Sequence, residues 1–259
     1  MDRVVVFDLT GPMAHFRKYY TNTSALTYGF PPRTVLMGIV AAVLGWERDT
    51  YYERLDAGRY AVAIKVPGRR LVQTVNYLRT KKEDLSELRR LGRVPGTQTP
   101  LEFLLPAGQH PALRFRVFFT HPDGELLAEV ARRLREGRSF YPLYLGLTEC
   151  PASALFVAQV EAHAYEVLPP SGAVALTTVL NAALLQDVVL GGTVAPRRLV
   201  RERVPQSFGP GRTLKPPASV IYEAGGQPFA VRLRVPAYRF RLRVGGSAPA
   251  EETVAFLEG

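Results

Sequence analysis

Short apolar runs separated by Gly and Pro predict a chain built mostly from strands. Residues 3–9 (Arg-Val-Val-Val-Phe-Asp-Leu) are β-branched and aromatic and end before Gly11-Pro12, which predicts a buried first strand. Residues 113–119 alternate, with Leu113, Phe115, Val117 and Phe119 on one face and Arg114 and Arg116 on the other. This alternation predicts a strand with one polar face, and similar runs predict further strands at 59–66, 71–78 and 154–160.

Two segments have the pattern of a helix. An almost wholly apolar run at 35–45 follows Pro31-Pro32, and because proline is tolerated in a first helical turn, we expect this helix to begin near Pro32. The helix should be buried, and its small residues should let a sheet approach closely. A second helix is expected after Asp123, which would be its N-cap, with apolar residues at helical spacing up to Leu134.

The order of these elements predicts the fold. Between the second and third strands lies a basic segment, about 67–112, punctuated by Pro and Gly, which we interpret as a protruding arm. Without the arm, the order is βαββαβ, which is that of ferredoxin-like and RNA-recognition-motif domains. We therefore predict an α+β fold, with a ferredoxin-like domain at 1–165 and a smaller β-rich C-terminal region at 166–259, where strands near 229–244 expose arginines to solvent.

The net charge indicates the kind of partner that the protein binds. The 259 residues include 33 Lys plus Arg against 23 Asp plus Glu, which gives +10 and points to a polyanionic partner. No apolar run reaches the roughly 18 residues that span a bilayer. The N-terminus lacks the pattern of a signal peptide, so we expect a soluble cytoplasmic protein without a membrane partner. The single cysteine, Cys150, excludes an internal disulfide and a Cys-rich zinc site.

Candidate catalytic chemistry is sparse. The chain has no Gly-x-x-x-x-Gly-Lys phosphate loop, and its four histidines are scattered without metal-ligand spacing, so we expect neither a metal nor a cofactor. Metal-independent RNA cleavage needs only a general base and a cation near a 2′-hydroxyl. His15 and His121 are candidate bases for such a reaction, with Tyr28 and Lys18 as helpers, and an endoribonuclease stays open as an alternative.

RNA binding fits the loop at 15–34 better. The loop combines cations, rings and an amide in Arg17, Lys18, Tyr19, Tyr20 and Asn22, and single-stranded RNA offers phosphates, bases and base edges to such side chains. No Ser, Thr, Asp or Asn stands directly before Pro32 to cap the following helix. The N–H groups of Arg33, Thr34 and Val35 should therefore need an outside acceptor, and a phosphate suits a helix N-terminus.

Several of these residues also carry a family resemblance. Residues 9–17 (Leu-Thr-Gly-Pro-Met-Ala-His-Phe-Arg), 28–34 (Tyr-Gly-Phe-Pro-Pro-Arg-Thr) and 41–45 (Ala-Ala-Val-Leu-Gly) resemble the fifth CRISPR-associated (Cas) protein family. A weaker match at 145–151 (Leu-Gly-Leu-Thr-Glu-Cys-Pro) resembles that family's glycine-containing loop, with Leu147 where an arginine often stands.

The resemblance implies a RAMP-superfamily subunit of a type I CRISPR surveillance complex (Cascade) in antiviral defence. Such a subunit binds the 5′ handle of the crRNA, inserts a thumb hairpin between its second and third strands, and contacts the backbone and large subunits. The handle would be gripped by Arg17, Lys18, Tyr20, Tyr28, Arg33 and Thr34, and the thumb would carry Arg79, Lys81 and Lys82. One branch of the family, in type I-C systems, processes precursor crRNA with a Tyr, Lys and His set, which this sequence does not match. We therefore expect a non-catalytic, type I-B-like subunit.

Overall fold

The computed structural model describes residues 2–21, 24–77, 82–90, 92, 94, 96–170, 172–189, 198–244 and 248–258. Over these residues the fold is mixed α/β, mostly strands with four α-helices. Its central sheet has four antiparallel strands in the order β2-β5-β1-β6. These strands are β1 (Arg3–Gly11), β2 (Arg59–Val66), β5 (Leu113–Thr120) and β6 (Ser153–Glu161).

Both faces of the central sheet are covered. In β5 all residues except Arg114 are buried. The prediction that Arg116 lies on a solvent-facing side is wrong, because the residue is only 4% exposed and its guanidinium forms two hydrogen bonds with the Asp8 carboxylate, at 2.7 and 2.9 Å. Glu252, from the C-terminal region, also pairs with Arg116. Neutralisation by two carboxylates lets an arginine lie under a second layer of strands.

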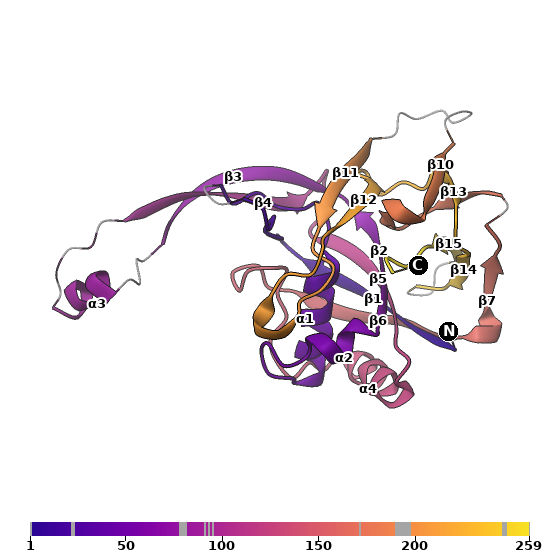
Figure 1. Ribbon diagram of the computed structural model, residues 1–259, viewed down its shortest axis with the longest axis horizontal. Helices are drawn as coiled ribbons and strands as arrows, with labels where there is room; N and C mark the ends of the chain where they lie inside the picture. Colours follow the sequence, from indigo (N-terminus) through magenta and orange to yellow (C-terminus); the bar gives the residue numbers. More distant parts are fainter. Residues whose placement is uncertain are drawn as a thin grey trace.

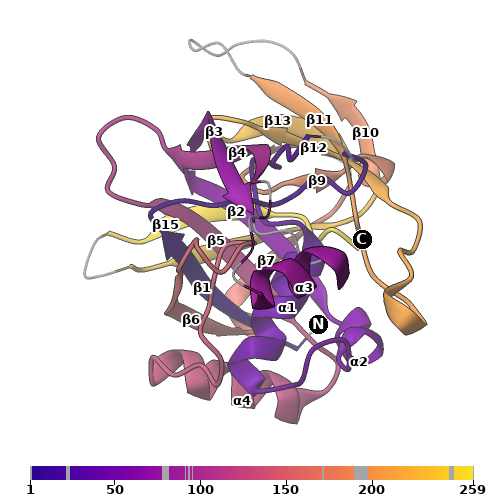
Figure 2. The same ribbon diagram turned by 90° about the vertical axis from the view of Figure 1, so that its left-hand side faces the viewer.

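Three helices cover the first face. The helix α1 (Arg33–Leu44) packs against α4 (Gly124–Arg135), and α2 (Tyr52–Asp56), for which no helix was predicted, lies beside it. Asp123 caps α4 as predicted, accepting the N–H groups of Glu125 and Leu126 at 3.0 Å. Figures 1 and 2 show these helices grouped on one side of the sheet. The core on the helix face also contains Val220, whereas the opposite face of the sheet packs against Phe240 and Val254.

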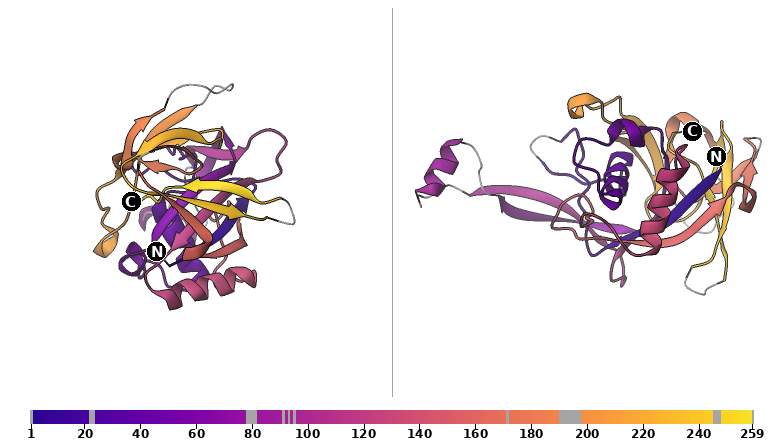
Figure 3. Two further views of the ribbon diagram at one scale, coloured as in Figure 1. Left: turned by 90° about the vertical axis from the view of Figure 1, so that its right-hand side faces the viewer. Right: turned by 90° about the horizontal axis from the view of Figure 1, so that it is seen from below.

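The arm projects from the body between β2 and β5. Its antiparallel strands are β3 (Gly68–Tyr77) and β4 (Thr97–Pro106), and α3 (Lys82–Arg89) lies at its far end (Figures 1 and 3). The hairpin lies in the segment where the sequence predicted an arm, although its helix was not predicted, and its role as a thumb stays a prediction. Exposed apolar side chains lie on the arm at Leu71, Val72, Tyr77 and Leu85.

The C-terminal region consists of three small antiparallel sheets, ordered β10-β13-β8, β11-β12-β9 and β15-β14-β7. Its strands are β7 (Tyr165–Leu168), β8 (Ala173–Leu176), β9 (Leu180–Asn181), β10 (Leu185–Val188), β11 (Leu199–Val204), β12 (Ala218–Glu223), β13 (Phe229–Leu233), β14 (Ala237–Leu242) and β15 (Ala250–Val254). The main hydrophobic core takes side chains from both sides of residue 165, for example Phe7 and Val220. The domain boundary at 165 therefore stays a prediction.

Two further features bear on the sequence expectations. Cys150 is a free, buried cysteine, and burial raises the pKa of its thiol to about 11, which keeps it protonated at neutral pH. None of the helices in the described ranges has both the length and the apolar character needed to span a bilayer.

Candidate nucleic-acid interface

The loop between residues 16 and 28 folds back on itself and presents two aromatic rings. A β-bridge joins Arg17 to Thr27 across the loop. Tyr19 and Tyr20 lie at the turn, 36% and 49% exposed, with their ring centroids 5.2 Å apart in edge contact. Exposed rings of this kind are the surfaces on which unpaired bases stack.

This loop lies at the base of the arm. Its returning strand runs beside β4, because Ala25 forms a bridge with Leu101 and the N–H of Thr27 donates to the Glu102 carboxylate at 2.9 Å. Ala14, just before the loop, forms a bridge with Leu104 further along β4. The exposed rings are therefore held at a fixed place against the arm.

Arg17 is the exposed cation of the loop. Its guanidinium donates one hydrogen bond of 3.2 Å, to the Thr21 carbonyl oxygen. Among the described residues it has no carboxylate partner, so it is open to a ligand. Arg17 and Tyr20 thus have the exposure that the predicted RNA contacts require, and the contacts stay predictions. Asn22 lies outside the described residues.

Lys18, by contrast, points into the protein. Only 8% of the residue is exposed, and its Nζ lies 2.5 Å from the carboxylate of Glu202 on β11 and 5.6 Å from the centre of the Tyr28 ring. Arg70 on β3 approaches the same carboxylate at 3.6 Å. Since its charge is already neutralised, Lys18 attaches the loop to the C-terminal region and does not fit the predicted phosphate contact.

Tyr28 is likewise part of the core. Its ring is fully buried, and its hydroxyl donates to the Arg203 carbonyl oxygen at 2.6 Å. Burial raises the pKa of this hydroxyl far above its ordinary value. The predicted contact of Tyr28 with RNA does not fit this position, and the residue instead fixes the loop against β11.

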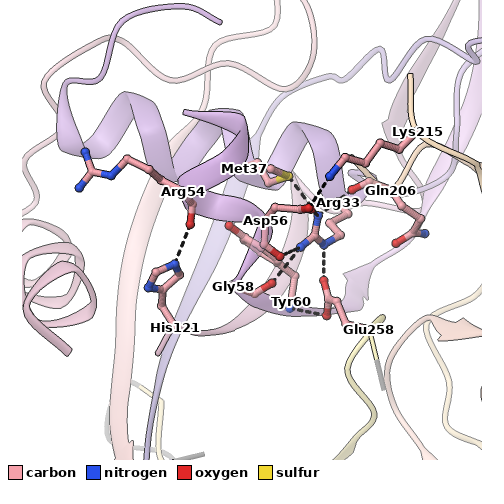
Figure 4. Close-up of polar contacts among 10 residues, drawn as sticks. All are labelled: Arg33, Met37, Arg54, Asp56, Gly58, Tyr60, His121, Gln206, Lys215 and Glu258. Atoms are coloured by element: carbon pink, nitrogen blue, oxygen red, sulfur yellow. Dashed lines mark hydrogen bonds and ion pairs between the residues drawn. The ribbon is translucent and has the colours of Figure 1, made fainter. Parts of the chain in front are cut away.

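Arg33 begins α1 and turns inward (Figure 4). The residue is 3% exposed, and its guanidinium is surrounded by acceptors from three other segments of the chain. These acceptors are the carboxylates of Glu258 and Asp56 and the carbonyl oxygens of Asp56, Gly58 and Gln206. Burial alone would lower the pKa of Arg33, but Glu258 and Asp56 together raise it. The predicted phosphate contact is therefore not compatible with this arrangement.

The first turn of α1 is only partly as predicted. Pro32 is the N-cap and gives no side-chain cap, but its carbonyl oxygen accepts the N–H of Val35 at 2.8 Å, so that group does not need an outside acceptor. Thr34 is half-buried and faces a groove of about 840 Å³ between α1 and the segment 141–151. The predicted contact of Thr34 with RNA stays a prediction.

The groove is lined mainly by apolar and aromatic side chains. Small residues of α1 line the groove. This corrects the prediction that a sheet packs against them. Tyr141 and Tyr144 are 40% and 43% exposed at its rim. The other rings of the lining are Trp46 and Tyr51.

Gly146 fixes the wall of this groove. Its φ is +93°, and a Cβ atom there would lie 1.9 Å from the carbonyl oxygen of His15. The neighbouring Leu145 accepts the N–H of His15 at 3.0 Å. Only glycine combines this backbone conformation with so close an approach.

Both candidate catalytic histidines are held by backbone groups. His15 is 2% exposed, its Nδ1 donates to the Glu102 carbonyl oxygen at 2.8 Å, and burial lowers its pKa. His121 donates from Nε2 to the Arg54 carbonyl oxygen at 2.9 Å (Figure 4) and accepts the N–H of Asp123 at Nδ1. In the part of the chain that the structure describes, no group of three or more His, Cys, Asp or Glu side chains could hold a metal.

The predicted contacts at the tip of the arm fall where little is described. Arg79 and Lys81 lie outside the described residues. Lys82 is the first residue of α3, but its side chain is outside them too. These three contacts stay predictions.

A family model described as CRISPR-associated protein (Cas_Cas5) matches residues 4–220. The chain belongs to the Cas5 family. The resemblance recognised in the sequence is thereby confirmed. No curated protein matches the chain in sequence.

Solved structures share the fold of this Cas5 family member. A CRISPR protein from Archaeoglobus fulgidus is similar over 97% of this chain and 98% of its own, with a TM-score of 0.55 and 15% identity. A chain of a CRISPR RNA-guided surveillance complex is similar over 88% of this chain and 91% of its own, with a TM-score of 0.51 and 18% identity.

Sequence reasoning missed two parts of the interface in this Cas5 protein. The aromatic groove was missed because Tyr141 lies far along the chain from Trp46 and Tyr51, although a cluster of rings just before the glycine-containing loop was visible. Glu202 was missed because its partner Lys18 lies 184 residues away, and no local pattern connects them.

Proposed function

We propose that this Cas5 family member is a non-catalytic subunit of a type I Cascade complex, of type I-B-like kind, that binds the 5′ handle of the crRNA. It would act in the cytoplasm in antiviral defence, with the backbone and large subunits of the complex as its other partners. Family membership supports the CRISPR role. The strand order of the central sheet supports a ferredoxin-like domain with the arm as its thumb.

One observation carries the RNA-binding part of this proposal. Tyr19 and Tyr20 are exposed at the base of the arm with the Arg17 guanidinium in the same loop, and the loop is attached to the body through Lys18 and Tyr28. Because the loop is held in place, less conformational entropy is lost when the exposed rings bind a ligand. The groove between α1 and residues 141–151 gives a second aromatic surface, beside the helix that follows this loop in the chain.

The hydrogen bonds and burial of His15 and His121 support the absence of catalysis. A general base must reach the proton that it abstracts and must have a free lone pair. Both ring nitrogens of His121 are already in hydrogen bonds, and His15 is 2% exposed.

Binding of handle RNA to the purified protein tests the proposal. We expect a preference for single-stranded RNA with an intact 5′ handle over RNA with a scrambled handle. Tyr20→Leu should weaken binding by about 1 to 3 kcal/mol, the value of one stacked base, whereas Tyr20→Phe keeps the ring and should bind like the wild type. Equal affinity for both RNAs would reject handle binding.

Incubation with precursor crRNA in EDTA tests the alternative function. We expect bound but intact RNA. Specific cleavage that is lost in His15→Ala or His121→Ala would favour the metal-independent endoribonuclease.

A further inference from the structure

The arginines on the strands of the C-terminal region fall into two groups. On β13 and β14 they face carboxylates: Arg232 lies 3.8 Å from Asp187, and Arg239 and Arg241 lie 2.8 Å from Glu166 and Glu251. These pairs agree with the interpretation of that sheet surface as solvent-exposed. Exposed pairs of this kind have little charge left to attract a polyanion.

β11 carries the second group. Its residues alternate in direction, as in any strand. Glu202 points inward to Lys18, so Arg201 and Arg203 on either side of it point the other way and are exposed. Arg201 donates to the Ser219 hydroxyl at 2.9 Å. Among the described residues, neither guanidinium forms an ion pair with a carboxylate.

β11 also lies beside the aromatic loop. It is an edge strand of its sheet, and the carbonyl oxygen of Arg203 accepts the Tyr28 hydroxyl at 2.6 Å. The ion pair between Lys18 and Glu202 joins the same loop to β11 one residue before Arg203. Tyr19 and Tyr20 lie close enough to Tyr28 to influence its pKa. The loop and the end of β11 are thus neighbours, joined by these two contacts.

We propose that Arg201 and Arg203 bind phosphates of the same RNA strand whose bases stack on the Tyr19–Tyr20 turn. The inference rests on the proposed function and extends it to a strand of the C-terminal region. Two unpaired guanidinium groups next to exposed rings match single-stranded nucleic acid, which presents phosphates and base faces together. An acidic protein would need the cations alone, so the rings favour RNA.

The test compares two double variants with the same loss of charge. Arg201→Ala/Arg203→Ala removes the unpaired arginines, and Arg239→Ala/Arg241→Ala removes two paired ones. Binding of handle RNA to the full chain is measured by fluorescence anisotropy over a series of KCl concentrations. We expect the first variant to have a log–log slope shallower by about 1.4, since each lost phosphate contact on a single strand removes about 0.7. The second should run parallel to the wild type.

Two further measurements keep the outcome unambiguous. Urea unfolding shows whether the variants are folded, and Arg201→Lys/Arg203→Lys should retain most of the slope because lysine keeps the charge. If the wild type prefers handle RNA but the first variant has an unchanged slope, the inference is overturned and the proposed function stands. Unchanged RNA binding with loss of a co-purifying protein would assign the surface to an acidic protein and also overturn it. A wild type without handle preference would overturn the proposed function itself.

Discussion

The basic side chains near the loop divide according to burial. Lys18 and Arg33 are less than 10% exposed and pair with carboxylates, whereas Arg17 and Arg203 are exposed and have none as a salt-bridge partner within the described residues. Removing a buried cation is costly, because its carboxylate partner is then left buried without a compensating charge. The buried residues therefore stabilise the fold, and only the exposed ones can bind an external anion.

Arg33 shows this cost most directly. Arg33→Met should lower the free energy of unfolding by about 3 kcal/mol or more, because it leaves the Glu258 carboxylate without its partner and Asp56 with Lys215 alone. Urea unfolding measures this loss. Arg17→Ala, at an exposed residue with one backbone hydrogen bond, should change stability by less than about 0.5 kcal/mol.

A double variant separates the ion pair from simple loss of volume. Glu258 also accepts the N–H of Tyr60 at 2.9 Å, which glutamine can still do. Arg33→Met/Glu258→Gln should therefore recover part of the loss, since the uncompensated charge is gone. Equal losses for Arg33→Met and Arg17→Ala would contradict the structural role.

His15 predicts a dependence of stability on pH. Burial, with a smaller effect from Arg17, holds the pKa of His15 below its ordinary value of 6.5, although the Glu102 carbonyl oxygen and carboxylate raise it. Below pH 6.5, His15 therefore binds a proton more readily in the unfolded chain than in the native state. Stability should fall as pH drops below about 6.5, by at most about 1.4 kcal/mol per pH unit.

Urea unfolding at about pH 7.5 and about pH 5.5 measures this effect. His15→Asn can still donate to the Glu102 carbonyl oxygen but does not titrate, so the difference between the two pH values should shrink. His163→Gln, at an exposed residue, should leave the difference unchanged. A wild type that is equally stable at both pH values would show that His15 is protonated in the native state.

At the scale of elements, local patterns predicted what depends on local chemistry. The apolar run of β1 and the cap and spacing of α4 were sufficient to predict both elements. The helix α3 was missed because its eight residues are mostly polar and its apolar Leu85 is exposed, so no buried face marks it. The inward position of Arg116 depends on Glu252, which lies 136 residues further along the chain and could not be inferred from alternation within β5.

Gly146 connects an element to the candidate site. Gly146→Ala would place a methyl group 1.9 Å from the His15 carbonyl oxygen at a φ of +93°. Gly137→Ala is a matched control, because its φ is also positive, at +65°, but nothing lies within 4 Å of the added carbon. The control should lose about 1 to 2 kcal/mol from backbone strain alone.

Urea unfolding should show a clearly larger loss for Gly146→Ala. The His15 carbonyl cannot move away easily, since the N–H of the same residue donates to Leu145. Handle RNA should also bind more weakly to this variant, because the segment that the substitution displaces forms one wall of the groove. Equal losses for the two variants would mean that the segment adapts without cost.

At the scale of the whole molecule, the arm and the body have different roles. The three hydrophobic clusters lie in the body, and the arm contributes to them only near its base, through Leu104 and Phe103. None of the described residues from 76 to 98 is buried. An extension that buries so little of itself gains stability only from a partner.

Shortening the arm tests this separation. Residues 76–98 are replaced by Asn-Gly, which joins the paired residues Val75 and Thr99 through a two-residue hairpin turn. Because no buried side chain is removed, the free energy of unfolding should stay within about 1 kcal/mol of the wild type. Handle RNA should keep its contacts with the loop and β11, whereas co-purification with the backbone subunit should be lost, since Tyr77 and Leu85 are gone. A large loss of stability would show that the arm is part of the folded body, and undiminished co-purification would place the subunit contact elsewhere.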